Sequence, residues 1–277
     1  MALPAPGDDR AAIVTGASSG IGAAIALELA RRGHQVVLVA RNADRLHALA
    51  GTLSPRAHVL PADLSRPSDR AALPGRVAAL GLVPDVLINN AGLSTLAPVA
   101  ASVPGQQLNL VEVDVAAVVD LCSRLVPAMV DRGRGAVLNV SSLAGFSPLP
   151  EQAVYGAAKA FVLSYTESLR IELRGTGVTA TALCPGPVAT GFDEVAGFNE
   201  GERQAVLPGV MWKSTDEVAR AGIDGLAANK GVVIPGLVNR LAAVFCRVVP
   251  HETLLPFLAR RTPLTRRARG HRVVESR

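Results

Sequence analysis

Short hydrophobic runs alternate along the chain with longer segments in which apolar residues recur at helical spacing. The runs are rich in β-branched residues, and their nearly continuous hydrophobicity is typical of strands that are covered on both faces of a parallel sheet. We therefore predict strands at 11–16, 35–40, 58–63, 85–90, 135–140, 178–185 and 231–236. The intervening pattern predicts helices at 20–32, 42–50, 68–80, 104–131, 152–174 and 215–228.

This alternation predicts the fold class. Strands that are each followed by a helix form a doubly wound α/β domain, here a Rossmann-type parallel sheet of seven strands with helices on both faces. We expect one such domain over residues 1–236, with a cofactor half at about 8–140 and a catalytic and substrate half at about 141–236. No repeat or low-complexity segment divides it.

The alternation stops after residue 236, where a C-terminal extension begins. Amphipathic segments at 237–249 and 252–261 predict that this extension is helical and basic over 237–261. Residues 262–277 contain many arginines and few apolar residues, so we expect them to form a basic, disordered tail.

The net charge of +5 is concentrated in this extension. From Leu237 onward nine Arg stand against Glu252 and Glu275, a local charge of +7 that leaves −2 for the other 236 residues. A basic amphipathic segment could lie on an anionic membrane, or it could pack on the domain or on a second subunit with its arginines in water. Nucleic-acid binding is disfavoured because the chain has no recognition motif and no aromatic residues interleaved with the charges.

The composition fits one large domain. Of 277 residues 49% are hydrophobic but only 3% aromatic, so the core must consist mainly of Ala, Val, Leu and Ile. Cys122, Cys184 and Cys246 show no metal or redox spacing, and we interpret them as reduced, buried thiols of a cytoplasmic protein. We expect neither a signal peptide nor a spanning helix, because no uncharged apolar run reaches about 18 residues.

A glycine-rich loop, TGASSGIG (15–22), joins the first predicted strand to the first predicted helix. Glycines there permit a tight turn and a close approach of the backbone to phosphate, and the N–H groups at a helix start attract anions. The alternative is a glycine-rich turn without a ligand. The candidate cofactor-binding residues of the loop are Gly16, Ser18, Ser19, Gly20, Ile21 and Gly22.

The second predicted strand ends at Ala40 and is followed by Arg41. Enzymes that prefer NAD usually carry an acidic residue near this point, where it binds the ribose hydroxyls of the adenosine. A guanidinium group instead suits the 2′-phosphate of NADP, so we predict NADP as the cofactor. The alternative is an ordinary solvent-exposed arginine.

The segment YGAAK (155–159) places Tyr155 and Lys159 one helical turn apart on one face of a helix. Thirteen residues earlier, Ser142 closes the strand-like run NVSS, at the sheet edge where ligands bind. Ser142 could hydrogen-bond a substrate carbonyl while Tyr155 delivers its proton. A free tyrosine has a pKa of about 10, and an adjacent ammonium group should lower it. The alternative is a helix with a core tyrosine and a surface lysine.

Together these motifs make the chain resemble the short-chain dehydrogenase/reductase family from residue 11 to about 236. The match consists of TGASSGIG, Asp63-Leu64, NNAG (89–92), Ser142, YGAAK and PGPVAT (185–190). The resemblance implies that Ser142, Tyr155 and Lys159 are catalytic and that Lys159 also holds the nicotinamide ribose. It further assigns three groups of residues to the cofactor site. Asp63 and Leu64 would lie beside the adenine, and Asn90, Ala91 and Gly92 beside the ribose and the central strand. The residues beside the nicotinamide would be Pro185, Gly186, Val188 and Thr190.

The run LVEVDVAAVVDL (110–121) contains an acid that the helical pattern does not explain. The helical neighbours of Asp114 include Leu110, Ala117 and Leu121, so its face is apolar and a carboxylate there is costly. The resemblance places Asp114 where the family usually carries a catalytic Asn that interrupts regular helix bonding and takes part in proton relay to the lysine. Asp114 could pair with Lys159 or remain protonated, and we treat it as a fourth candidate catalytic residue.

Two segments, 143–150 and 191–210, should wall the substrate site. They offer Leu143, Phe146, Pro148, Leu149, Phe192 and Phe198 and almost no basic group, which favours a lipophilic substrate over a small anion. The alternative is that these side chains only pack a lid. The C-terminal arrangement resembles actinobacterial 3-oxoacyl reductases, including those that act on mycolate-type lipids.

The combined prediction is an NADPH-dependent reductase of a lipophilic ketone, in particular of a 3-oxoacyl chain carried as an acyl thioester. A secondary-alcohol or hydroxysteroid dehydrogenase is the alternative within the family, and a non-catalytic NADP-binding sensor or scaffold is the alternative outside it. The family resemblance also implies a homodimer or homotetramer that is formed through the two long helices, 104–131 and 152–174. We expect a cytoplasmic protein with a possible membrane contact through its basic tail.

Overall fold

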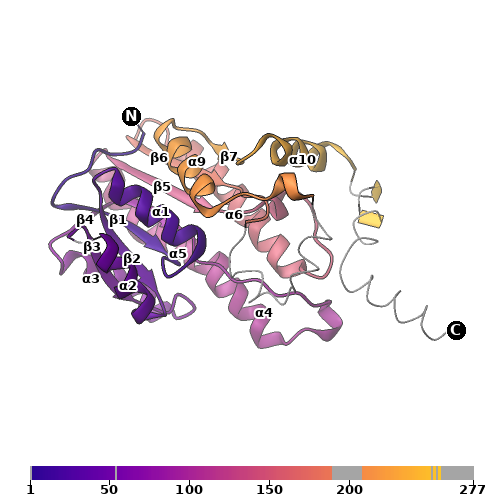
Figure 1. Cartoon of the computed structure of the whole chain (residues 1–277), viewed down its shortest axis with the longest axis horizontal. Helices are drawn as coiled ribbons and strands as arrows, with labels where there is room; N and C mark the ends of the chain where they lie inside the picture. Colours follow the sequence, from indigo (N-terminus) through magenta and orange to yellow (C-terminus); the bar gives the residue numbers. More distant parts are fainter. Residues whose placement is uncertain (1, 54, 189–207, 251, 254, 257–277) are drawn as a thin grey trace, which may run out of the picture.

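The computed structural model describes residues 2–53, 55–188, 208–250, 252–253 and 255–256 (Figure 1). Within these residues seven parallel strands form one sheet in the order β3-β2-β1-β4-β5-β6-β7, which confirms the Rossmann-type fold. The strand order reverses between β1 and β4, where sheets of this type bind their ligands. The strands are β1 (Arg10–Thr15), β2 (Gln35–Ala40), β3 (Ala57–Pro61), β4 (Val83–Asn89), β5 (Gly135–Val140), β6 (Val178–Leu183) and β7 (Val232–Val233).

Helices cover both faces of the sheet and bury a separate apolar core on each. Helices α1, α2 and α9 pack on one face, and α3, α5 and α6 pack on the other. Ala12 and Val14 of β1 belong to the first core, and Ala11 and Ile13 to the second, since successive side chains of a strand point to opposite faces. The helices are α1 (Gly20–Arg31), α2 (Ala43–Leu53), α3 (Pro67–Ala78), α4 (Pro104–Val111), α5 (Ala117–Asp131), α6 (Ala153–Glu172), α9 (Thr215–Ala227) and α10 (Leu237–Val248).

The element boundaries depart from prediction at two places. The strand expected at 231–236 is reduced to the two residues of β7, because Pro235 cannot donate to a ladder and Gly236 has a φ of +89°. The helix expected at 104–131 is divided into α4 and α5 by a π-helix, η2 (Glu112–Ala116). This segment contains Asp114, so the irregularity lies where the family resemblance places an interrupted helix.

The extension begins with α10, which lies beyond β7, at the right of the view in Figure 1. Residues 252–253 and 255–256 are helical, as expected for the second amphipathic segment. The rest of that segment and the tail at 262–277 lie outside the described residues, so the predicted disorder stays a prediction. Among the residues that the structure describes, no helix has the length and apolarity that a membrane span needs.

Candidate active site

The glycine-rich loop occupies the carboxyl end of β1 and opens α1, as predicted. Gly16 and Gly20 adopt left-handed backbone conformations, with φ of +66° and +57°. A Cβ atom on Gly22 would collide with the carbonyl group of Gly16, so only glycine allows the turn to close this tightly. Ser19 is the N-cap residue of α1, but its side chain makes no capping hydrogen bond, and Ser18 and Ile21 lie beside it in the same turn. The loop can therefore admit phosphate close to its backbone.

A threonine and an asparagine hold this loop against β4. The Oγ1 atom of Thr15 donates to the carbonyl of Ile88 at 3.1 Å and accepts from the N–H groups of Asn90 at 2.9 Å and Ala91 at 3.0 Å. The side-chain amide of Asn90 donates to the Thr15 carbonyl at 2.9 Å. Asn90 and Ala91 thus stand at the topological switch point, as the family resemblance implies. The sequence analysis did not identify Thr15, whose only signal was its position at the end of a buried strand.

Arg41 and Asp63 lie at the adjoining carboxyl ends of β2 and β3. Arg41 is exposed directly after the last residue of β2. Burial alone would raise the pKa of Asp63, but hydrogen bonds from the hydroxyl and N–H of Ser65 together with the charges of Arg41 and Arg66 lower it. Leu64 is buried in the core beside Asp63. The structure thus presents a cation and an anion at the end of the sheet next to the loop, where the adenosine part of a dinucleotide would lie.

Ser142, Tyr155 and Lys159 lie on two elements that pack against each other. Ser142 follows β5 and caps the 3₁₀ helix η3 (Leu143–Phe146), where its Oγ accepts from the N–H of Ala144 at 3.1 Å. Helix α6 packs on η3 and places the Lys159 Nζ 5.6 Å from the centre of the Tyr155 ring. Tyr155 is half-buried, whereas Lys159 is only 5% exposed. The alternative of a core tyrosine with a surface lysine is therefore wrong, since the lysine is the more buried of the two.

Asp114 is the partner of Lys159. Its Oδ2 atom lies 3.0 Å from the Lys159 Nζ, and its Oδ1 atom accepts from the N–H of Leu93 at 2.7 Å. The Lys159 Nζ also donates to the carbonyl of Val140 at 3.3 Å. A Cβ atom on Gly92 would stand 3.1 Å from both the Lys159 Nζ and the Asp114 Oδ2, so glycine at this position leaves room for the ion pair.

Burial and mutual attraction shift the pKa values of this pair. Burial raises the pKa of Asp114, against the lowering effects of Lys159 and the Leu93 N–H. Burial alone would lower the pKa of Lys159, but the charges of Asp114 and Tyr155 outweigh it and raise that pKa. Lys159 is thus held as an ammonium group beside the Tyr155 ring.

The other two acids of LVEVDVAAVVDL have a different role. Glu112 and Asp120 each lie 3.0 Å from the buried guanidinium group of Arg70 on α3, and Asp120 also pairs with Arg124 at 2.7 Å. Arg70 further donates to the Leu64 carbonyl at 2.7 Å. These acids fasten the long helix to α3, so that Asp114 alone faces the catalytic groups.

Ser141 is a second residue that the sequence analysis missed. It is buried beside the predicted Ser142, and its Oγ donates to the main-chain carbonyl of Lys159 at 2.7 Å. A Cβ atom on Gly145 would clash with the same carbonyl. The two serines after β5 therefore have different roles. Ser141 holds α6 through its hydrogen bond, whereas Ser142 is the candidate catalytic residue. The double serine in NVSS was the only sequence signal for this.

The loop after β6 carries the predicted nicotinamide-side residues Pro185, Gly186 and Val188. The Pro185 carbonyl accepts from the Leu143 N–H at 2.9 Å, which ties this loop to η3. The side chain of Asn239 of α10 packs so closely on Gly186 that a Cβ atom there would clash. Thr190, Phe192 and Phe198 lie outside the described residues.

Two residues predicted to wall the substrate site, Leu143 and Phe146 of η3, belong to a small core with Leu163 of α6 and Ala243 of α10. This packing agrees with the alternative in which these side chains pack against neighbouring elements. Of the three cysteines, Cys122 and Cys184 are buried free thiols as predicted, but Cys246 is only half-buried. Burial raises the pKa of Cys184 to about 12, against a hydrogen bond to Ser141.

The sequence profile described as short chain dehydrogenase matches residues 10–200. The protein therefore belongs to the short-chain dehydrogenase/reductase family, an oxidoreductase family. It is 37% identical over 218 residues to sulfoacetaldehyde reductase of Chromohalobacter salexigens, covering 74% of this chain and 83% of that one. It is 33% identical over 204 residues to very-long-chain 3-oxoacyl-CoA reductase of Anas platyrhynchos, covering 69% of this chain and 64% of that one.

Solved structures agree with this assignment. A short-chain dehydrogenase from Sphingobium yanoikuyae in complex with NADPH superposes with a TM-score of 0.76 at 34% identity. The superposition covers 85% of this chain and 92% of that chain.

Proposed function

We propose that the protein is an NADPH-dependent reductase that transfers hydride to the keto group of a lipophilic substrate, a 3-oxoacyl chain. The observation that carries the proposal is the buried Lys159 ammonium group, which Asp114 holds 3.0 Å away and which stands beside Tyr155 at the carboxyl edge of the sheet. A buried ion pair of this kind is expensive in stability, and its place beside a proton donor favours a catalytic purpose.

The chain's own groups can prepare a carbonyl for reduction. Ser142 and Tyr155 can both donate hydrogen bonds to the carbonyl oxygen, which polarises the bond. When bound, NADPH supplies the hydride that reaches the carbonyl carbon. The Tyr155 hydroxyl gives its proton to the oxygen as negative charge develops there, and the Lys159 ammonium group stabilises the resulting phenolate.

Asp114 acts on this chemistry through Lys159. Its carboxylate lies 3.0 Å from the ammonium group, and the Leu93 N–H donates to the carboxylate in turn. Asp114 is thus a positioning residue that occupies the place of the asparagine in the resembled family. We propose that a polar group is required here, because an apolar side chain would leave the buried ammonium group without its partner.

The residues of the cofactor site fit NADP. The glycine loop leaves space for phosphate that a Cβ atom would fill, and Arg41 provides a cation at the end of β2 where NAD enzymes usually place an acid. The NADPH complex of the 34% identical structural relative supports the same choice.

Arg41→Ala tests this cofactor assignment. NADPH should bind the parent protein at least about tenfold more tightly than NADH, as measured by fluorescence titration, because a 2′-phosphate gains a charge-assisted contact. The Arg41→Ala variant should bind both cofactors equally. Equal affinities in the parent protein would refute the assignment of Arg41, while leaving the catalytic residues unaffected.

The substrate class is supported by the apolar wall. Segment 143–150, LAGFSPLP, carries no basic group, and Leu143 and Phe146 are packed with apolar neighbours. A small anion such as the substrate in the name of the sulfoacetaldehyde reductase would need a cation. The likeness to a very-long-chain 3-oxoacyl-CoA reductase supports the acyl assignment.

The test is NADPH oxidation against 3-oxoacyl thioesters of increasing chain length, with a steroid ketone, a sugar ketone and sulfoacetaldehyde for comparison. We expect kcat/KM to rise with acyl length, because each buried CH₂ group contributes about 0.8 kcal/mol. Tyr155→Phe should abolish turnover and leave NADPH binding nearly unchanged. A higher kcat/KM for sulfoacetaldehyde or a sugar ketone than for every thioester would contradict the proposed substrate, and turnover by Tyr155→Phe would contradict the mechanism.

A further inference from the structure

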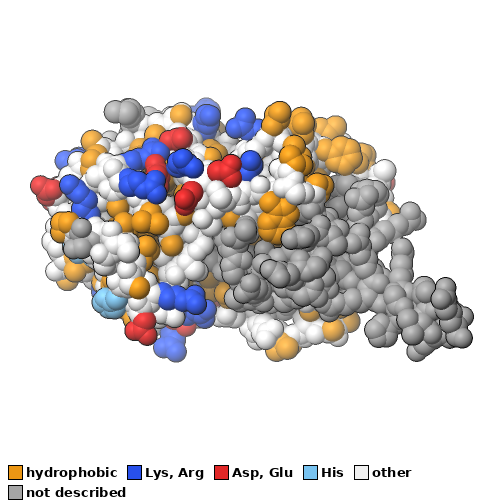
Figure 2. All heavy atoms as spheres, viewed as in Figure 1, with side chains coloured by type: hydrophobic (Ala, Val, Ile, Leu, Met, Phe, Trp, Pro, Cys, Tyr) orange, Lys and Arg blue, Asp and Glu red, His pale blue; other side chains and the backbone are white. Residues whose placement is uncertain are grey.

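Helix α10 exposes its apolar side. Its residues Leu237, Leu241, Val244, Phe245 and Val248 recur at helical spacing and are between 56% and 75% exposed. We call these five residues the outer face of α10. Figure 2 shows hydrophobic side chains gathered at the end of the molecule where Figure 1 places α10. A contiguous apolar patch of this kind is rare on the surface of a monomeric soluble protein and marks an interaction site.

The opposite side of α10 holds the helix in this orientation. Asn239 is buried, and its side-chain amide donates to the carbonyl groups of Pro235 at 2.8 Å and Met211 at 3.0 Å. Ala243 is buried against η3. The helix therefore turns a polar and a small residue toward the domain and its large apolar residues outward. Packing of α10 on the domain was one of the two alternatives for this segment, and the outward apolar residues are the part of it that the amphipathic pattern did not specify.

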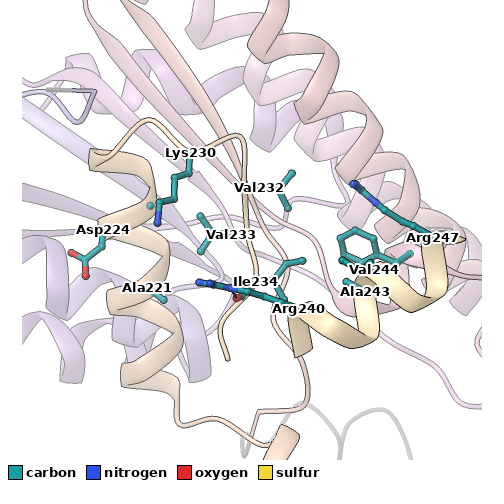
Figure 3. Close-up of a pocket in the computed structure, with 12 residues that line it drawn as sticks. Ala221, Asp224, Lys230, Val232, Val233, Ile234, Arg240, Ala243, Val244 and Arg247 are labelled. Carbon is teal, nitrogen blue, oxygen red and sulfur yellow. Dashed lines mark hydrogen bonds between the residues drawn. The ribbon is translucent and has the colours of Figure 1, made fainter. Parts of the chain in front are cut away.

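The two arginines of α10 are exposed and border a groove. The Arg240 Nε donates to the Ile234 carbonyl at 3.0 Å, and the Arg247 guanidinium lies 4.8 Å from the centre of the Phe146 ring. Both side chains reach from α10 across a groove between α9, β7 and α10, and Lys230 lies on the other side of this groove (Figure 3). The groove has a volume of about 550 Å³. The acid on this groove, Asp224, is paired with Arg32 at 2.6 Å, and Arg247 pairs with the exposed Glu167 at 3.4 Å. We call this feature the basic groove.

We propose that the outer face of α10 docks on the surface of an anionic lipid bilayer. A helix whose apolar side enters the boundary between headgroups and acyl chains gains the burial that this face lacks in the free protein. The basic groove borders the same helix, so Lys230, Arg240 and Arg247 lie where anionic headgroups would be. Apolar and cationic features of one helix thus match the two layers of such a surface.

The charge of the chain favours a bilayer over a second copy as the occupant. Residues 257–277 follow α10 closely and contain seven Arg against one Glu. Two chains that each carry this excess of positive charge repel each other. An anionic bilayer neutralises them instead, at about 1 kcal/mol for each basic residue near the surface.

Docking through α10 would place the substrate side of the enzyme at the bilayer. The Asn239 side chain of α10 packs on Gly186, and Ala243 packs on η3, which begins directly after Ser142. This consequence rests on the proposed function, because it matters only if the substrate is a lipophilic acyl chain. The docking itself does not depend on turnover.

The experiment measures binding of the full-length protein to large unilamellar vesicles by flotation. Vesicles contain equal parts of phosphatidylglycerol and phosphatidylcholine, or phosphatidylcholine alone. We expect the parent to bind the anionic vesicles at least about tenfold more strongly. Leu241→Gln with Phe245→Gln should reduce that binding about tenfold or more, since both side chains lose apolar burial. Val99→Gln with Val103→Gln is the matched control, because these exposed residues lie before α4.

Three outcomes would overturn the proposal: no vesicle binding by the parent, equal binding by the α10 variant, or equal loss in the control. Sedimentation velocity without vesicles tests the other occupant. If the parent is larger than the α10 variant in solution and binds no vesicles, the outer face joins copies of the chain. NADPH oxidation in the same preparations separates the two proposals, because a failed substrate assignment leaves vesicle binding unchanged.

Discussion

Two helical segments of this protein carry side chains whose polarity opposes their surroundings. The π-helix η2 buries the carboxylate of Asp114, which is only 1% exposed, and α10 leaves its outer face in solvent. The first mismatch is compensated inside the molecule, because Lys159 and the Leu93 N–H meet the carboxylate. Within the residues that the structure describes, nothing covers the second. A buried charge that has a partner inside the protein indicates a catalytic role. An exposed apolar face that has no such partner indicates contact with another surface.

The internal mismatch lowers the stability of the protein. Placing two opposite charges in the interior costs several kcal/mol of desolvation for each ion, and their attraction offsets this only in part. A leucine would fit the pattern of Leu110, Ala117 and Leu121 better than Asp114 does. The acid is thus explained by its effect on Lys159 rather than by any contribution to folding.

The largest expected effect is that of Lys159→Met, which removes the internal partner. Turnover should fall by about 100-fold or more, because the proton donor loses its adjacent cation. The free energy of unfolding, measured by urea denaturation, should fall by about 3 kcal/mol, because Asp114 is left buried and unpaired.

The double variant Lys159→Met with Asp114→Leu is the control for that prediction. It removes both charges, so it should regain most of the lost stability while remaining inactive. A single Lys159→Met variant with the stability of the parent would show that the buried pair does not carry the energy we assign to it.

A smaller effect is expected from Arg70→Leu, which tests the acids on either side of Asp114. The variant leaves Glu112, Asp120 and the Leu64 carbonyl without their buried donor, so the free energy of unfolding should fall by about 2 kcal/mol. The value of kcat should stay within about threefold of the parent, because the chemistry acts through Asp114 alone. A loss of turnover comparable to that of Lys159→Met would remove the distinction between the three acids.

The smallest expected effect is a pH dependence of stability in Asp114→Asn. Because the pKa of Asp114 is raised in the folded protein from the ordinary 3.8, its contribution to stability is fully present below about pH 4 and is lost as the pH rises through the raised pKa. Urea unfolding between pH 4 and 7 should therefore show the parent losing stability relative to Asp114→Asn. A relative gain by the parent with rising pH would mean that Lys159 lowers the pKa of Asp114 more than burial raises it.

Much of the fold could be predicted because it depends on local pattern. Strands β2 and β5 have the bounds that their apolar runs predicted, since both faces of these strands are buried. β7 was overestimated, because Pro235 and Gly236 end the ladder while the hydrophobic pattern continues. The π-helix was indicated only by the family resemblance at Asp114 and not by the helical periodicity of 104–131.

The candidate site was predictable where it uses motifs and hidden where it uses tertiary contacts. The glycine loop, Tyr155 and Lys159 lie where their spacing predicted. Ser141 and Thr15 support them through hydrogen bonds to residues far apart in the sequence, which no local pattern records. The outward orientation of α10 depends on Asn239 reaching two carbonyl groups, whereas amphipathicity alone left both membrane contact and packing on the domain open.

The most direct test compares kcat for NADPH oxidation in Asp114→Asn and Asp114→Leu, with urea unfolding of the same preparations. Asparagine restores the polar residue of the resembled family, so Asp114→Asn should keep or exceed the parent rate. Leucine preserves the helix and the volume but removes the polar group. The kcat of Asp114→Leu should therefore fall by a factor of about ten or more. If Asp114→Leu instead stabilises the protein and turns over at the parent rate, the acid does not serve Lys159, and the account of the active site is wrong.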